Sequence, residues 1–122
     1  MEGTRVLLVD DELSSAEVLA LVLAGEGYQV TVAADARQAL ERLEEADPEL
    51  LVSDFMMPGM NGADLAKAIR ERERFREIPV LMISGAPESA LKAYRPQYDA
   101  FLRKPFGLEE FLEVLQKLLR AR

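Results

Sequence analysis

The sequence predicts an α/β fold in which five parallel strands alternate with five helices. Short runs of β-branched and leucine residues recur along the chain, and longer stretches with apolar residues at helical spacing separate them. Strict alternation of this kind predicts a parallel sheet with helices on both faces. A chain of 122 residues is long enough for one such domain, so residues 1–122 are expected to form a single unit.

The expected elements follow in chain order. Strands are predicted over residues 5–9, 29–33, 50–53, 80–83 and 100–103, and helices over residues 15–26, 36–46, 62–73, 88–95 and 108–120. With right-handed crossovers, five such units favour the strand order 2-1-3-4-5, which is a flavodoxin-like (βα)5 arrangement. Ligands of such sheets bind beyond the carboxyl ends of the strands, where the winding direction reverses between strands one and three.

Several helix ends carry sequence signals. Ser14 with Glu17, and Asp35 with Gln38, have the spacing of a capping box, and Asn61 is the expected N-cap of the third helix. The last helix has an apolar stripe, acidic residues at its start and basic residues at its end, which is the order that the helix dipole favours.

The composition excludes several kinds of chemistry. The chain has no cysteine and no histidine, so it forms no disulfide, no thiolate metal site and no phosphohistidine. Its net charge of −7 disfavours nucleic acid and anionic membranes as direct partners. The longest apolar stretch, Val18–Ala24, is far shorter than the ~20 residues that cross a bilayer, and we expect a cytoplasmic protein.

Polar residues follow four of the five predicted strands. Asp10 and Asp11 follow the first strand, Asp54 the third, Ser84 the fourth and Lys104 the fifth. Because parallel strands end at the same edge of a sheet, we expect three carboxylates, a hydroxyl and an ammonium group to share one cleft. That set of groups suits a divalent cation together with a phosphoryl group.

Each of these residues alone also has a structural interpretation. A single acidic run favours the positive N-terminus of a helix, and a single Asp, Ser or Lys after a strand is often a turn or surface residue. Three neighbouring carboxylates are harder to explain by structure alone. Two carboxylates about 4 Å apart repel by roughly 4 kcal/mol at an effective dielectric constant of 20. Such a group needs a counter-charge, and its oxygen ligands select Mg²⁺ or a similar hard cation.

Four short motifs occur in order along the chain. They are Val9-Asp10-Asp11, Asp54 followed by Met57-Pro58 and Asn61-Gly62, then Ser84-Gly85-Ala86, and finally Lys104-Pro105-Phe106. With these motifs the sequence resembles the receiver domains of bacterial response regulators, of the single-domain chemotaxis-regulator type, over essentially its whole length. The resemblance implies a phosphoacceptor signalling switch of a two-component system, which is no enzyme beyond its own phosphorylation and dephosphorylation.

The resemblance also implies roles for single residues. Asp54 is the implied phosphoacceptor. Asp10, Asp11, Asp54 and the backbone carbonyl of Met56 are the implied ligands of Mg²⁺ or Mn²⁺, with Asp11 binding directly and Asp10 mainly through water. Lys104 is the implied partner of the phosphoryl group.

Ser84 and Phe101 are the implied switch residues. On phosphorylation, Ser84 would hydrogen-bond the phosphoryl group and vacate space, and Phe101 would swing inward. The surface near helix 4, strand 5 and helix 5 would change as a result. Phe101 has no hydroxyl to hold an inward position, so a permanently buried Phe101 is the alternative.

The implied phosphate donor is a sensor histidine kinase or a phosphotransfer protein, and the implied target is a further protein. A monomer or a weak homodimer is expected. The alternative function is a phosphorylation-independent protein-interaction module with a receiver fold. A metal-dependent phosphohydrolase is disfavoured, because it needs an acid two residues after its nucleophile, where Met56 stands.

The chain departs from the family pattern in two places. Pro96-Gln97-Tyr98 stands where the family usually has Ala-Gly-Ala, and Pro96 is expected to end the fourth helix, which should be short or irregular. The usual output face therefore cannot be assumed. Met56 and Ala86 flank the phosphorylation site without a group that orients water, so we expect that self-dephosphorylation is not accelerated.

Overall fold

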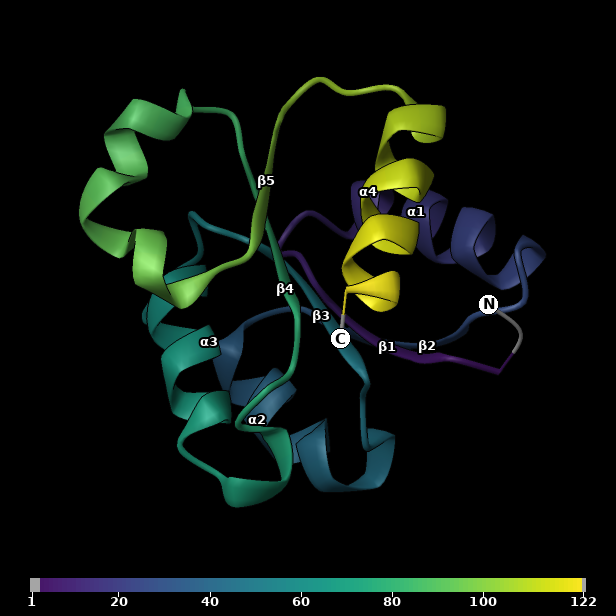
Figure 1. Cartoon of the computed structure of the whole chain (residues 1–122), viewed down its shortest axis with the longest axis horizontal. Helices are drawn as coiled ribbons and strands as arrows, with labels where there is room; N and C mark the ends of the chain where they lie inside the picture. The colour runs from purple at the N-terminus through teal and green to yellow at the C-terminus, as the bar shows by residue number, and fades with distance from the viewer. Residues whose placement is uncertain (1–2, 122) are drawn as a thin grey trace.

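The computed structural model describes residues 3–121 and confirms the predicted fold (Figure 1). Five parallel strands form one sheet in the order β2-β1-β3-β4-β5. The strands are β1 (Arg5–Val9), β2 (Gln29–Ala33), β3 (Leu50–Asp54), β4 (Val80–Ser84) and β5 (Ala100–Arg103). The alternation of apolar runs with helical stretches thus predicts both the strands and their order correctly.

Four α-helices and two 3₁₀ segments connect or follow the strands within residues 3–121. They are α1 (Leu13–Gly25), α2 (Ala36–Ala46), α3 (Gly62–Arg70), η1 (Glu73–Phe75), η2 (Glu88–Gln97) and α4 (Leu108–Arg120). The segment η2 occupies the place of the predicted fourth helix, and α4 that of the fifth. The third helix is shorter than predicted, because the chain leaves α3 after Arg70 and makes the separate turn η1 before β4.

Two of the three expected N-caps are present. Asp35 accepts a hydrogen bond from the N–H of Gln38, and Asn61 accepts one from the N–H of Asp64, each at 2.8 Å. These bonds satisfy N–H groups that have no partner inside the helix.

The predicted capping box at Ser14 and Glu17 is wrong. The first helix already begins at Leu13, with Glu12 as the residue before it, so Ser14 lies inside the first turn. The side chain of Glu12 instead accepts a hydrogen bond from the Ser15 hydroxyl.

The sheet separates two apolar clusters. Along β1, Leu7 and Val9 belong to the cluster beneath α2 and α3, whereas Val6 and Leu8 belong to the cluster beneath α1 and α4. Figure 1 shows the same division, with α1 and α4 on one side of the sheet and α2 and α3 on the other. Because both faces are covered, the strands are held firmly and their carboxyl ends form a fixed edge.

The expectation of an irregular fourth helix is confirmed. The segment η2 is a 3₁₀ helix rather than an α-helix, and Leu91 is the one residue in it that is fully buried. Pro96 does not end the segment, contrary to expectation, since the 3₁₀ turns continue to Gln97. The φ that the proline ring imposes lies within the range of a 3₁₀ helix, which explains why Pro96 is tolerated there. Within residues 3–121, no helix is both long and apolar enough to cross a bilayer.

Candidate functional site

The polar residues singled out in the sequence lie at one edge of the sheet. The strand register pairs Asp54 with Ile83 and Ser84 with Arg103, so the ends of β3, β4 and β5 are level. Asp10 directly follows β1, which is hydrogen-bonded to β3. The parallel topology therefore brings together side chains that lie up to ninety-four positions apart in the sequence.

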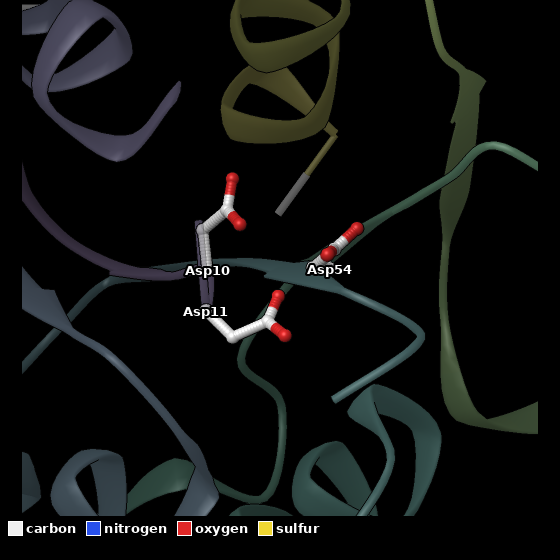
Figure 2. A group of neighbouring side chains, drawn as sticks. All are labelled: Asp10, Asp11 and Asp54. Carbon is white, nitrogen blue, oxygen red and sulfur yellow. The ribbon is translucent and has the colours of Figure 1, made fainter. Parts of the chain in front are cut away.

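Three carboxylates meet at this edge. Asp10 and Asp11 come from the end of β1 and Asp54 from the end of β3, as Figure 2 shows. Each contributes one oxygen, and the three oxygens all lie within 4.8 Å of one another. Asp10 and Asp54 are buried, whereas Asp11 is exposed and leaves the group open to solvent. Asp10 is oriented by the N–H of Glu12, which donates to its Oδ1 at 2.9 Å.

Lys104 is the cation at this site. Its Nζ lies 3.3 Å from Oδ1 of Asp54 and 3.9 Å from Oδ2 of Asp10. The backbone N–H of Lys104 donates to the carbonyl of Ser84 at 2.8 Å, and the peptide bond that follows, to Pro105, is cis. One ammonium group is therefore paired with two of the three carboxylates, and the cluster keeps an excess of negative charge.

Two of these acids, Asp54 and Asp10, hold a proton more tightly than an ordinary aspartate. Burial raises the pKa of Asp54 to about 6, although the charge of Lys104 opposes the rise and Asp10 adds to it. Burial likewise raises the pKa of Asp10, against the opposing effects of the Glu12 N–H and Lys104. A buried excess of carboxylates fits a hard dication, because such an ion favours oxygen ligands and would offset both burial and mutual repulsion.

Ser84 lies at the same edge but is engaged elsewhere. Its side chain is fully buried, and its hydroxyl accepts a hydrogen bond of 3.1 Å from the N–H of Ala86. Among the described residues, no hydrogen bond joins Ser84 to the carboxylates. Phe101 is half-buried, and its ring centroid lies 6.2 Å from that of Tyr98. Met56 has an exposed side chain two residues after Asp54.

Two residues that contact the backbone of Asp54 were not predicted as site residues from the sequence. The Ser53 hydroxyl donates to the backbone carbonyl of Asp54 at 2.9 Å. A Cβ at Gly62 would lie 2.3 Å from that same carbonyl oxygen, so only glycine fits there. The Asn61-Gly62 pair was visible in the sequence, but nothing in the sequence shows how close the two backbones come.

The comparison with known families decides which family the chain belongs to. The model of the response regulator receiver domain matches residues 6–116. The chain belongs to the response regulator receiver domain family. Receiver domains are signalling components of two-component systems and switch by phosphorylation. They bind Mg²⁺ at an acidic pocket. In this chain Asp10, Asp11 and Asp54 form a group of carboxylates that could hold such an ion.

Curated relatives of this receiver domain include longer proteins. The DNA-binding response regulator MtrA of Mycolicibacterium paratuberculosis is 34% identical over 118 residues, covering 95% of this chain and 51% of the relative. The sensory transduction protein RegX3 of Mycolicibacterium smegmatis is 33% identical over 119 residues, with coverages of 96% and 51%. The receiver domain thus spans about half the length of these relatives.

Solved structures resemble this receiver domain over nearly their whole length. The chemotaxis response regulator CheY4 of Vibrio cholerae has a TM-score of 0.88 and 32% identity, covering 95% of this chain and 98% of the other. The response regulator TrrA of Thermotoga maritima, solved in complex with Mg²⁺-BeF, has a TM-score of 0.83 and 27% identity, with coverages of 94% and 98%.

Proposed function

We propose that this receiver domain is a phosphorylation-controlled switch whose phosphoacceptor is Asp54. The observation that carries the proposal is the position of Asp54, buried among the acids and 3.3 Å from the Lys104 ammonium group. A carboxylate needs no general base to attack phosphorus. An Asp54 oxygen would form the new bond to phosphorus while the bond to the donor breaks, and the donor leaves with that electron pair.

The remaining residues of the site would neutralise charge. Asp10, Asp11, Asp54 and the carbonyl of Met56 would hold Mg²⁺ or Mn²⁺, which when bound neutralises the oxygens of a phosphoryl group. Lys104 would pair with the same oxygens, and the 3.3 Å between its Nζ and Oδ1 of Asp54 supports this role. The donor would be a sensor histidine kinase or a phosphotransfer protein, acting in the cytoplasm.

Ser84 and Phe101 would carry the signal away from the site. The Ser84 hydroxyl would turn from the Ala86 N–H to the phosphoryl group, and Phe101 would move into the space released. The affected surface is that of η2, β5 and α4, where a downstream protein would bind to a monomer or a weak homodimer of this domain. To change the population ratio of the two arrangements from 1:99 to 99:1, the phosphoryl group must favour the second arrangement by about 5.5 kcal/mol.

Intact-mass measurement tests the proposed phosphoacceptor. After incubation with Mg²⁺ and acetyl phosphate, the wild-type protein is expected to gain the mass of one phosphoryl group, and Asp54→Ala is expected to gain none. Asp64→Ala, an exposed aspartate at the start of α3, is the control and should behave as wild type. Equal phosphorylation of wild type and Asp54→Ala would exclude Asp54.

A phosphorylation-independent interaction module is the second candidate. It is favoured by the replacement of a regular fourth helix by η2 and by the lack of a hydroxyl on Phe101. The same mass measurement separates the two functions, because this module would gain no phosphate at any Mg²⁺ concentration.

The phosphorylated protein is expected to lose phosphate slowly. Met56 is exposed beside the site, and neither its thioether nor the methyl group of Ala86 orients water for attack. Met56→Asn should therefore shorten the lifetime of the phosphoprotein several-fold, measured by intact mass after removal of acetyl phosphate. Met60→Asn, in the same loop, serves as control. Faster loss from wild type than from Met56→Asn would contradict this prediction.

A further inference from the structure

The segment η2 places few side chains against the core, chiefly Leu91 and, beside Phe55, Tyr94. It runs for ten residues as a 3₁₀ helix, whereas runs longer than three or four residues are uncommon because the hydrogen-bond geometry is poor. Leu91 is its one fully buried side chain. The segment lies between Ser84, at the end of β4, and Phe101, in β5. The polar contacts at its two ends therefore lie between the two proposed switch residues.

The C-terminal end of η2 is fixed by Arg70. The guanidinium group donates to the carbonyls of Ile78 at 2.8 Å and of Gln97 at 3.3 Å, and it pairs with Asp99 at 2.7 Å. The Asp99 carboxylate also accepts a 2.8 Å hydrogen bond from the N–H of Val80. This network ties the end of η2 to α3 and to the start of β4.

The N-terminal end of η2 is tied to that fixed end through Tyr98. The Tyr98 hydroxyl donates to Oε2 of Glu88, the first residue of η2, at 2.9 Å. Arg95 pairs with the same oxygen at 3.7 Å. Tyr98 also packs against Phe101, with 6.2 Å between the ring centroids. We call the Glu88–Tyr98 hydrogen bond the clasp.

The clasp opposes a movement of Ser84. In the structure the Ser84 hydroxyl accepts from the N–H of Ala86, two residues before Glu88. A movement of the hydroxyl toward a phosphoryl group on Asp54 would give up this bond and pull on the short connection from Gly85 to Glu88. Because Glu88 is bound through Tyr98 to the fixed end of η2, such a movement would act against the clasp.

We propose that the clasp restrains the loop after Ser84 in the unphosphorylated arrangement, so that breaking it is part of the switch. The link to phosphorylation rests on the proposed function, but the restraint belongs to the unphosphorylated protein and is measured there. The Tyr98 hydroxyl thus supplies a hydrogen bond near the switch that Phe101 cannot make, because Phe101 has no hydroxyl.

Hydrogen exchange read by mass spectrometry tests the restraint without phosphate or metal. Tyr98→Phe keeps the ring against Phe101 and removes only the hydroxyl, so amides of residues 85–91 are expected to exchange about 3- to 10-fold faster, the effect of losing one net hydrogen bond. Tyr94→Phe is the matched control, because within residues 3–121 the Tyr94 hydroxyl has no hydrogen-bond partner. Glu88→Gln keeps an acceptor for Tyr98 and should retain most of the protection, whereas Glu88→Ala should not.

Phosphorylation by acetyl phosphate and Mg²⁺ tests the link to the switch. Tyr98→Phe should be phosphorylated several-fold faster than wild type and Tyr94→Phe. Exchange in residues 85–91 that is equal in Tyr98→Phe and wild type would overturn the restraint. Faster exchange with an unchanged phosphorylation rate would overturn its part in switching. Failure of every protein to take up phosphate would overturn the proposed function, and the exchange result would still decide the restraint.

Discussion

Replacing Asp54 by asparagine is expected to stabilise the metal-free protein at neutral pH by about 1 to 3 kcal/mol. Burial raises the pKa of Asp54 to about 6, against the attraction of Lys104. A rise from 3.8 to about 6 corresponds to about 3 kcal/mol of cost for holding the charged carboxylate in the folded state. Asparagine removes that cost. Because the pKa of about 6 already includes the attraction of Lys104 at 3.3 Å, about 3 kcal/mol is the upper bound of the gain.

The gain should depend on pH in one direction. Because the pKa of Asp54 is higher in the folded than in the unfolded state, folded wild-type protein binds the extra proton between about pH 4 and about pH 6. The contribution of Asp54 to stability therefore falls as the pH rises through this window. The advantage of Asp54→Asn should be small below about pH 4 and complete above about pH 6.

Urea unfolding in the presence of a chelator, compared at about pH 4 and about pH 7.5, measures this difference. Glu113→Gln, an exposed carboxylate on α4, is the control and should leave the free energy of unfolding unchanged. Addition of Mg²⁺ at one hundred times the dissociation constant should stabilise wild type by about 2.7 kcal/mol over its metal-free form, and it should stabilise Asp54→Asn less. A metal-free Asp54→Asn protein that is less stable than wild type at neutral pH would show that burying the charged Asp54 carboxylate does not lower the free energy of unfolding.

Replacing Gly62 by alanine is expected to destabilise the protein by about 3 kcal/mol or more. The added Cβ would lie 2.3 Å from the carbonyl oxygen of Asp54, 2.8 Å from Sδ of Met82 and 3.0 Å from Oγ of Ser53. The methionine can move, but the carbonyl is backbone of a strand that is covered on both faces. Overpacking of this kind typically costs about 1–3 kcal/mol, and a clash with fixed backbone belongs at the upper end.

Urea denaturation of Gly62→Ala beside Gly25→Ala tests this expectation. Gly25 ends α1 and has nothing within 4 Å of its would-be Cβ, so alanine there should be neutral or stabilising by up to about 1 kcal/mol. Gly62→Ala should also weaken the response of the melting temperature to Mg²⁺, since the strand end that carries Asp54 must shift. A Gly62→Ala protein as stable as wild type would mean that the loop after β3 yields easily.

The fold could be predicted because its signals are local. Each strand is a short apolar run and each crossover is helical in pattern, and parallel topology then follows from general rules of handedness. The same reasoning placed Asp10, Asp54 and Lys104 at one edge, because it needed only the ends of the strands. The ion pair between Lys104 and Asp54 is a direct consequence of that placement.

Features that depend on exact distances could not be predicted. Gly62 comes close to the Asp54 carbonyl where the loop after β3 folds back and the Gly62 N–H donates to the carbonyl of Phe55, and no sequence pattern encodes that distance. The clasp joins Glu88 to Tyr98 across ten positions of an irregular helix, where the usual spacing of three or four residues does not apply. The start of α1 was misplaced because a serine with a glutamate three residues later is also compatible with the interior of a helix.

The division of the core by the sheet has a consequence for how information passes through the molecule. The rings of Phe55, Tyr94, Tyr98 and Phe101 pack against the apolar cluster on the α2 and α3 side, whereas Phe106 packs against the cluster beneath α1 and α4. Rearrangement of the first four rings can proceed without repacking the layer beneath α1 and α4. Substitutions on the exposed side of α4, which belongs to the proposed docking surface, can therefore alter recognition without disturbing the rearrangement of these rings.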